Sequence, residues 1–145
     1  MVPNVGYYVQ SVDRMVKETE KIGEKMHPKY QVIREAIDQK KTAEITAEEL
    51  AEIICLFEEG TKKYHTIMKK ISRLRPPAKV MGIHKTFEKA YLSYIDGCEE
   101  MIQSLQSTAG IDSALFDASE EKQDRATDNI SASIQKMTKV LLKNK

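Results

Sequence analysis

The sequence predicts an all-α protein, and more closely an antiparallel up-down-up-down bundle of four helices. Of its 145 residues, 41% are hydrophobic and 31% are charged, which is ordinary for a globular domain with a buried core. Six glycines, four prolines and no tryptophan leave little of the turn chemistry that an all-β fold needs. Apolar residues also recur at helical spacing in four successive segments. We therefore treat residues 1–145 as a single helical domain.

The first predicted helix covers about residues 4–41. Pro28 lies inside it and lacks the N–H that would bond to the carbonyl of residue 24. The apolar pattern stays in phase across this proline, so we predict one long helix that is kinked near Pro28. Its apolar side is formed by Val5, Val9, Val12, Val16, Thr19, Met26, Tyr30, Ile33 and Ile37.

The second and third predicted helices cover about residues 46–74 and 78–108. Thr46 and Glu49 have the spacing of a capping box at the start of the second helix. The segment Arg75-Pro76-Pro77 ends that helix, because proline disfavours a helical conformation in the residue before it. The link between the two helices is so short that they must be antiparallel neighbours.

The fourth predicted helix covers about residues 117–143, with Asp117 as its cap and Glu120 three residues later. Its apolar stripe is the thinnest of the four, so we expect it to be the least stable helix. Four helices of these lengths with short links suit a bundle. The alternative is a three-helix array that dimerises, with the fourth helix exchanged or loose.

The motifs of common active sites and metal sites are missing from the sequence. Ferritin-like di-iron centres need two Glu-x-x-His motifs, and only Glu24 and His27 have that spacing, whereas His65 and His84 lack the glutamate. No glycine-rich phosphate loop, Gly-x-Ser-x-Gly turn or zinc-protease motif occurs. We therefore predict no catalytic residues, no metal site and no cofactor.

The two cysteines are predicted to be free thiols. In a hairpin centred on Pro76 and Pro77, Cys55 and Cys98 lie at the same height. Cys98 belongs to the apolar side of its helix, whereas Cys55 points among charged residues, so their Cβ atoms cannot approach closely enough for a disulfide. We expect Cys55 to be the more reactive thiol, because burial suppresses thiolate formation at Cys98.

Charge is distributed unevenly along the chain. Residues 61–90 carry nine basic side chains against Glu88 alone, whereas residues 42–60 carry six glutamates and no base. In an up-down bundle the end of the second helix, the start of the third and the end of the fourth meet, which predicts a molecule with a basic pole and an acidic opposite end. The basic pole is defined by Lys62, Lys63, Lys69, Lys70, Arg73, Arg75, Lys79, Lys85 and Lys89.

Three functional hypotheses follow from these patterns. The first is a non-enzymatic protein–protein interaction module, with a homodimer as one form. The second is a binder of nucleic acid or of an anionic surface through the basic pole, above all Lys69, Lys70, Arg73, Arg75 and Lys79. The third is a binder of a metal or small molecule in the bundle core near three histidines, which are His27, His65 and His84.

The amino terminus, Met1 to Tyr7, has neither the basic start nor the apolar stretch of a secretory signal. The longest apolar run, Ile53 to Phe57, is five residues, whereas a membrane-spanning helix needs about 20. We therefore expect no transmembrane segment and a cytoplasmic location, with a leader or lipid anchor ahead of Met1 as the open alternative.

Overall fold

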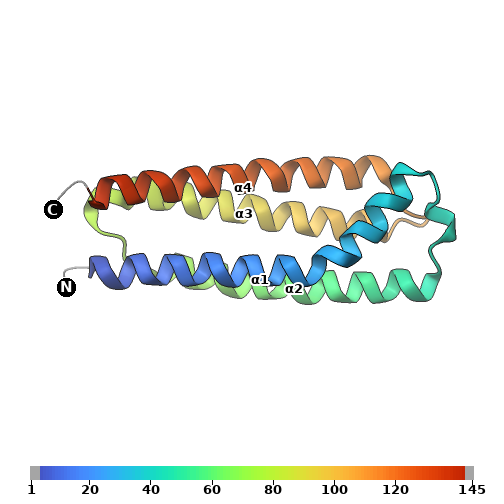
Figure 1. Ribbon diagram of the computed structural model, residues 1–145, viewed down its shortest axis with the longest axis horizontal. Coiled ribbons are helices and arrows are strands. Elements are labelled where there is room, and N and C mark those ends of the chain that lie inside the picture. Colours follow the sequence, from blue (N-terminus) through green and yellow to red (C-terminus); the bar gives the residue numbers. More distant parts are fainter. Residues whose placement is uncertain (1–3, 143–145) are drawn as a thin grey trace.

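The computed structural model describes residues 4–142, which form four long helices and two short 3-10 turns. No strand occurs within that range, so the predicted all-α class is confirmed. Figure 1 shows the four helices lying along one axis as an elongated bundle, with the chain turning back at each link. The long helices are α1 (Val5–Asp38), α2 (Ala47–Arg73), α3 (Met81–Leu105) and α4 (Ser113–Leu142), and the 3-10 turns are η1 (Thr42–Glu44) and η2 (Ala78–Val80).

Side chains cap the starts of α1, α2 and α4, whereas α3 has no side-chain cap. The Thr46 hydroxyl accepts a hydrogen bond from the backbone N–H of Glu49 at 3.0 Å, which confirms the predicted cap of α2. The predicted start of the fourth helix at Asp117 is wrong. Asp112 accepts from the backbone N–H of Leu115 at 3.0 Å, so α4 begins four residues earlier. Both Asp112 and Asp117 are suitable capping residues. The helix that starts after Asp112 includes Phe116, which is buried in the core.

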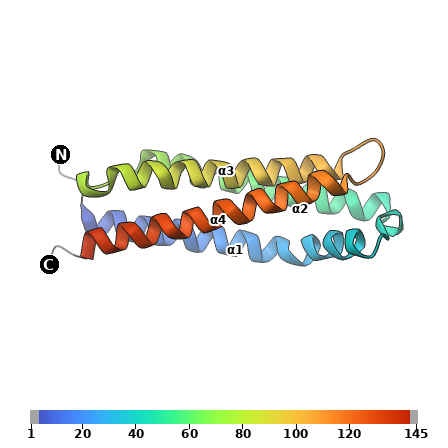
Figure 2. The ribbon, with the colours of Figure 1, turned by 90° about the horizontal axis from the view of Figure 1, so that it is seen from above.

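Two helices end earlier than predicted. α1 stops at Asp38 rather than near residue 41, because Lys40 adopts a left-handed backbone conformation with φ 57°. α3 ends at Leu105 rather than near residue 108. The links that follow these helices form the end of the bundle that is opposite to the termini in Figures 1 and 2.

α1 runs without interruption through Pro28. In Figure 1 its last third leans away from the direction of its first part and toward the start of α4. Contacts agree with this path, because the Tyr30 ring stacks on Phe116 of α4 with centroids 5.9 Å apart, and Arg34 pairs with Asp117. The last part of α1 therefore packs against the start of α4.

The buried core consists of two clusters at different heights in the bundle. One lies toward the chain termini and includes Tyr8, Ile71 and Phe87. The other lies toward the opposite end and includes Ile33 and Phe116. Met26 packs against both clusters, and the cavity described below is lined by Cys98 of the first and by Phe57 and Met101 of the second.

The apolar side predicted for the first helix is partly wrong. Val5 and Val9 are 45% and 46% exposed, whereas Tyr8, Val12 and Met15 are buried. Both stripes are apolar, so the pattern alone cannot choose between them. Packing selects the stripe with Tyr8, whose hydroxyl finds a buried partner in His84 at 2.7 Å.

α3 and α4 form the most extensive helix–helix contact, and small residues permit it. A Cβ atom added at Gly97 would lie 2.8 Å from Gln123 Cγ and 3.2 Å from the Ser119 carbonyl oxygen of α4. At Gly60 the space is taken instead by Met26. Another helix therefore approaches closely at both glycines. None of the helices within residues 4–142 has the length and hydropathy required to cross a bilayer.

Candidate functional site

The nine predicted residues of the basic pole are all exposed, and part of the set gathers around one pocket. Lys70, Arg73 and Arg75 line a pocket of about 570 Å³ between the start of α1 and the end of α2, together with Arg14 and Tyr7. Lys63 lines a neighbouring depression that also includes Lys70. The remaining five lie outside this pocket, on α2, in η2 and on α3: Lys62, Lys69, Lys79, Lys85 and Lys89.

The cations of this pocket are not neutralised by ion pairs. None of the ion pairs found among residues 4–142 involves Arg14, Lys70, Arg73 or Arg75, and Glu18 is the acidic residue in the lining. The carboxyl-terminal end of α2 carries a partial negative charge, which Lys70 and Arg73 more than offset. The pocket therefore presents a concave surface with an excess of positive charge to solvent.

Apolar side chains are exposed at the same end of the bundle. A groove of about 190 Å³ between the start of α1 and the end of α4 adjoins them, and its lining is mostly apolar, including Val9, Val16 and Leu141. Sequence reasoning missed this feature because it placed Val5 and Val9 in the core. The exposed apolar residues at this end are Val5, Tyr7, Val9, Met81 and Leu142.

A buried polar network supports the pole from inside. His84 Nδ1 lies 2.7 Å from the Tyr8 hydroxyl, and its Nε2 lies 3.1 Å from the Ile71 carbonyl oxygen and from Glu88 Oε1. The carbonyl only accepts, so in the neutral ring Nε2 carries the hydrogen and Tyr8 donates to Nδ1. Burial, and secondarily Glu88, raise the pKa of Tyr8 to about 12. This network ties α1, α2 and α3 together beneath the basic pocket.

The three histidines of the third hypothesis do not form a common site. His27 lines the central cavity, His65 is exposed and lies 2.8 Å from Glu99 Oε1, and His84 is buried in the network above. Within residues 4–142, no three histidine, cysteine, aspartate or glutamate side chains lie together as metal ligands. A small-molecule site in the core therefore has to rest on the cavity itself.

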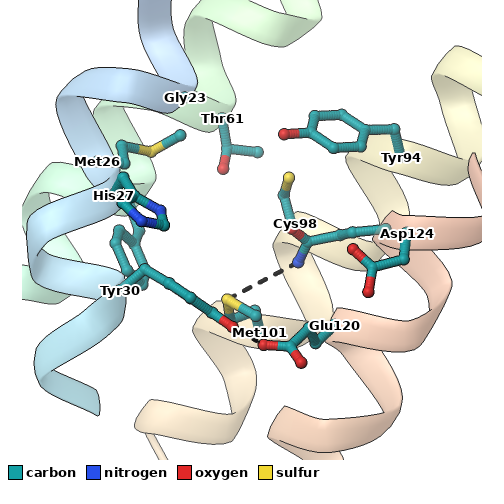
Figure 3. A pocket seen from close by; sticks show the side chains of 12 residues that line it. Gly23, Met26, His27, Tyr30, Thr61, Tyr94, Cys98, Met101, Glu120 and Asp124 are labelled. Carbon is teal, nitrogen blue, oxygen red and sulfur yellow. Dashed lines mark hydrogen bonds between the residues drawn. The ribbon is translucent and has the colours of Figure 1, made fainter. Parts of the chain in front are cut away.

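The central cavity has a volume of about 450 Å³ and receives side chains from all four helices. Figure 3 shows Met26, His27 and Tyr30 of α1 on one side and Glu120 and Asp124 of α4 on the other. No lysine or arginine belongs to its lining, which consists of Gly23, Met26, His27, Tyr30, Phe57, Thr61, Tyr94, Cys98, Met101, Glu120, Gln123 and Asp124.

The two carboxylates in the lining differ in their partners. Glu120 accepts a hydrogen bond from the Tyr30 hydroxyl and lies 3.4 Å from Arg34 Nη1. Burial raises the pKa of Glu120, and the neighbouring charge of Asp124 raises it further. Asp124 has no hydrogen-bond or ion-pair partner among the described residues.

The two cysteines are free, as predicted: Cys55 is exposed and Cys98 is buried. Burial raises the pKa of the Cys98 thiol to about 12, against a smaller opposing effect of a hydrogen bond with Tyr94. Because the thiolate is the nucleophile, Cys98 is held in the unreactive thiol form at pH 8.

We therefore expect native protein to react with Ellman's reagent in two well-separated phases. One equivalent, from Cys55, reacts rapidly, and the second reacts only when urea unfolds the chain. Cys55→Ser should abolish the rapid phase, and Cys98→Ser should leave it unchanged. Two equally rapid equivalents in native protein would contradict the burial of Cys98.

Comparison with models of protein families, with curated proteins and with solved structures finds no match to this chain.

Proposed function

We propose that this chain is a non-enzymatic binding module whose basic pole docks on an anionic lipid surface. The observation that carries the proposal is the juxtaposition at one end of the bundle of an unneutralised cationic pocket and exposed apolar side chains. Each alone has an ordinary explanation, because solvated charges and single exposed apolar residues are common on protein surfaces. Together they match the two layers of a membrane interface, where headgroup phosphates lie beside acyl chains.

The cationic pocket supplies the electrostatic part of binding. Arg14, Arg73 and Arg75 carry planar guanidinium groups, which suit bidentate contacts to phosphate oxygens. Basic residues near an anionic bilayer contribute about 1 kcal/mol each. The order of charges supports the same reading, since Lys79 in η2 and Lys85 and Lys89 in the first three turns of α3 place positive charge near a helix start, where helix stability favours acidic residues.

The apolar side chains favour a lipid surface over nucleic acid. Single-stranded nucleic acid is held by aromatic stacking platforms, and Tyr7, at 66% exposed, is the aromatic side chain open to solvent at this end. Exposed apolar side chains form no favourable contact with a phosphate backbone, but they can insert into the headgroup region of a bilayer. At this end they are Val5, Val9, Met81 and Leu142. A cytoplasmic location, expected from the sequence, agrees with this proposal because anionic lipids concentrate in the cytoplasmic leaflet.

Vesicle co-sedimentation tests the proposal. The protein should bind phosphatidylcholine vesicles that contain phosphatidylserine, and should not bind pure phosphatidylcholine, with affinity falling between about 0.05 M and 0.2 M salt. The variant Lys70→Gln, Arg73→Gln, Arg75→Gln should lose on the order of 100-fold in affinity. A control that removes the same charge elsewhere, Lys25→Gln, Lys40→Gln, Lys41→Gln, should bind nearly as well as the native chain.

A second pair of substitutions separates lipid from nucleic acid. Val5→Ser with Val9→Ser changes only exposed positions and should weaken vesicle binding about tenfold. Binding to duplex DNA or RNA would not depend on these valines. The proposal fails if the triple variant still binds anionic vesicles, or if nucleic acid binds more tightly than vesicles and ignores the valine substitutions.

The protein–protein interaction module, predicted first from the sequence, is the second candidate. The apolar groove between α1 and α4 is the observation that favours it, because such grooves accept amphipathic helices. Homodimerisation through this face stays a prediction, which sedimentation of the native chain and of Val5→Ser with Val9→Ser would test. A native dimer that dissociates in the variant, without vesicle binding by either, would favour this candidate.

A further inference from the structure

We infer that the central cavity binds a small organic cation, an amine with an apolar or aromatic body. This site is separate from the basic pole and carries the opposite charge. Its volume of about 450 Å³ falls within the range of natural small-molecule pockets, about 300 to 1,000 Å³. The lining combines the aromatic and thioether groups typical of such pockets with a few polar side chains.

The charge of the lining selects a cation. Asp124 is exposed to solvent and has no hydrogen-bond or ion-pair partner among residues 4–142, and Glu120 shares its carboxylate between the Tyr30 hydroxyl and a long contact of 3.4 Å to Arg34. A positive charge between these two carboxylates would relieve the repulsion that contributes to the raised pKa of Glu120.

Arg34 does not supply the positive charge between Glu120 and Asp124. Its Nη2 lies 2.5 Å from Asp117 Oδ1, its Nε lies 3.4 Å from Asp38 Oδ1, and its guanidinium carbon lies 5.1 Å from the centre of the Phe116 ring. These contacts hold the guanidinium outside the cavity lining, on the side of Glu120 that faces Asp117. The carboxylate of Asp124 is therefore left for a cation that enters from solvent.

The hydroxyl of Thr61 is an independent sign that the cavity takes a polar ligand. Thr61 is 6% exposed and lines the cavity, and Figure 3 shows its hydroxyl pointing inward. Its hydroxyl makes no hydrogen bond with the described residues, and it is not among their fully buried polar atoms that lack a partner, so it is open to the cavity and free to bond to a ligand there. Other helical threonines in this chain donate to the carbonyl four residues earlier: Thr19, Thr66, Thr86, Thr127 and Thr138.

The remaining walls suit the body of such a ligand. Tyr94 and Tyr30 present aromatic rings, which attract cations and pack against apolar groups. Met26 and Met101 contribute flexible thioethers that adapt to the shape of a ligand. Figure 3 places these side chains around a common space, with the carboxylates at one edge. The expected pose has the ammonium group near Asp124 and Glu120 and the apolar body between the aromatic rings and the methionines.

Three probes of matched shape test the inference by isothermal titration calorimetry. Phenethylamine, phenethyl alcohol and phenylpropionate share a benzyl body and differ in the charge of the head group. The amine should bind with a dissociation constant of about 1 mM or tighter. It should bind about tenfold tighter than the alcohol, and the anion should bind most weakly.

Substitutions locate the site and separate ligand binding from folding. Asp124→Asn should weaken the amine about tenfold, whereas Asp128→Asn, one turn further along α4 and outside the lining, should leave its affinity unchanged. Thr61→Val should weaken the amine about threefold while leaving the protein about as stable, because the hydroxyl it removes makes no hydrogen bond with the described residues. A structural role for Thr61 would instead lower the unfolding temperature.

The inference is overturned if the amine does not bind, if the alcohol binds as tightly, or if Asp124→Asn leaves amine binding unchanged. The variant Lys70→Gln, Arg73→Gln, Arg75→Gln should bind the amine as tightly as the native chain. A result that refutes the amine site can therefore be distinguished from one that refutes lipid binding by the basic pole.

Discussion

Replacing His84 by alanine is expected to lower the free energy of unfolding by about 3 kcal/mol or more, as loss of a large buried side chain usually does. The imidazole is 2% exposed and lies among side chains of the core cluster nearest the basic pole. Its removal leaves a hole and takes the partner from the Tyr8 hydroxyl, which then retains a long contact of 3.3 Å to the sulfur of Met137. Urea unfolding followed by circular dichroism measures the loss.

Two further variants show whether the loss comes from this network. Tyr8→Phe keeps the ring and removes the hydroxyl, so it leaves His84 Nδ1 without its donor and should cost about 1 to 3 kcal/mol. His65→Ala is the matched control, because the pair of His65 with Glu99 is about half exposed, and it should change stability by less than about 0.5 kcal/mol. Equal effects of His65→Ala and His84→Ala would refute the structural role of the buried ring.

Gly97→Ala is expected to destabilise the bundle by about 1 to 3 kcal/mol, although alanine is the better helix former by about 1 kcal/mol. The added Cβ would lie 2.8 Å from Gln123 Cγ and 3.3 Å from the Gln123 backbone nitrogen, so α4 has to move away from α3. That movement also strains the hydrogen bond of 3.2 Å that the Gln123 side-chain amide donates to the Gly97 carbonyl.

Gly82→Ala, in the same helix, is expected to change stability in the opposite direction. Among residues 4–142, no heavy atom other than the local neighbours lies within 4 Å of a Cβ at Gly82, so the substitution should stabilise α3 by about 0.5 to 1 kcal/mol. Thermal unfolding of the two variants beside the native chain measures both effects. If Gly97→Ala stabilises the protein as much as Gly82→Ala does, the close approach of α3 and α4 is refuted.

The sequence predicted part of the basic pole but did not predict the central cavity. Charge order along the chain and a short Pro76-Pro77 link were enough to predict that Lys70, Arg73 and Arg75 lie at one end of the bundle. The pocket among them also needs Arg14, which is far away in sequence. The cavity was not predicted, because its lining combines side chains of all four helices, among them Met26 and His27 of α1 and Glu120 and Asp124 of α4.

By itself the sequence determined the class of fold, the cap at Thr46, the end of α2 before Pro76 and the separation of charge. These features depend on contacts within a few residues or on the order of charges, so a linear pattern contains them. Tertiary structure alone decided which apolar stripe of α1 is buried, with Tyr8 inside and Val9 outside. The reason is that rotation of a helix about its axis is set by the shapes and hydrogen-bond partners that the other helices present.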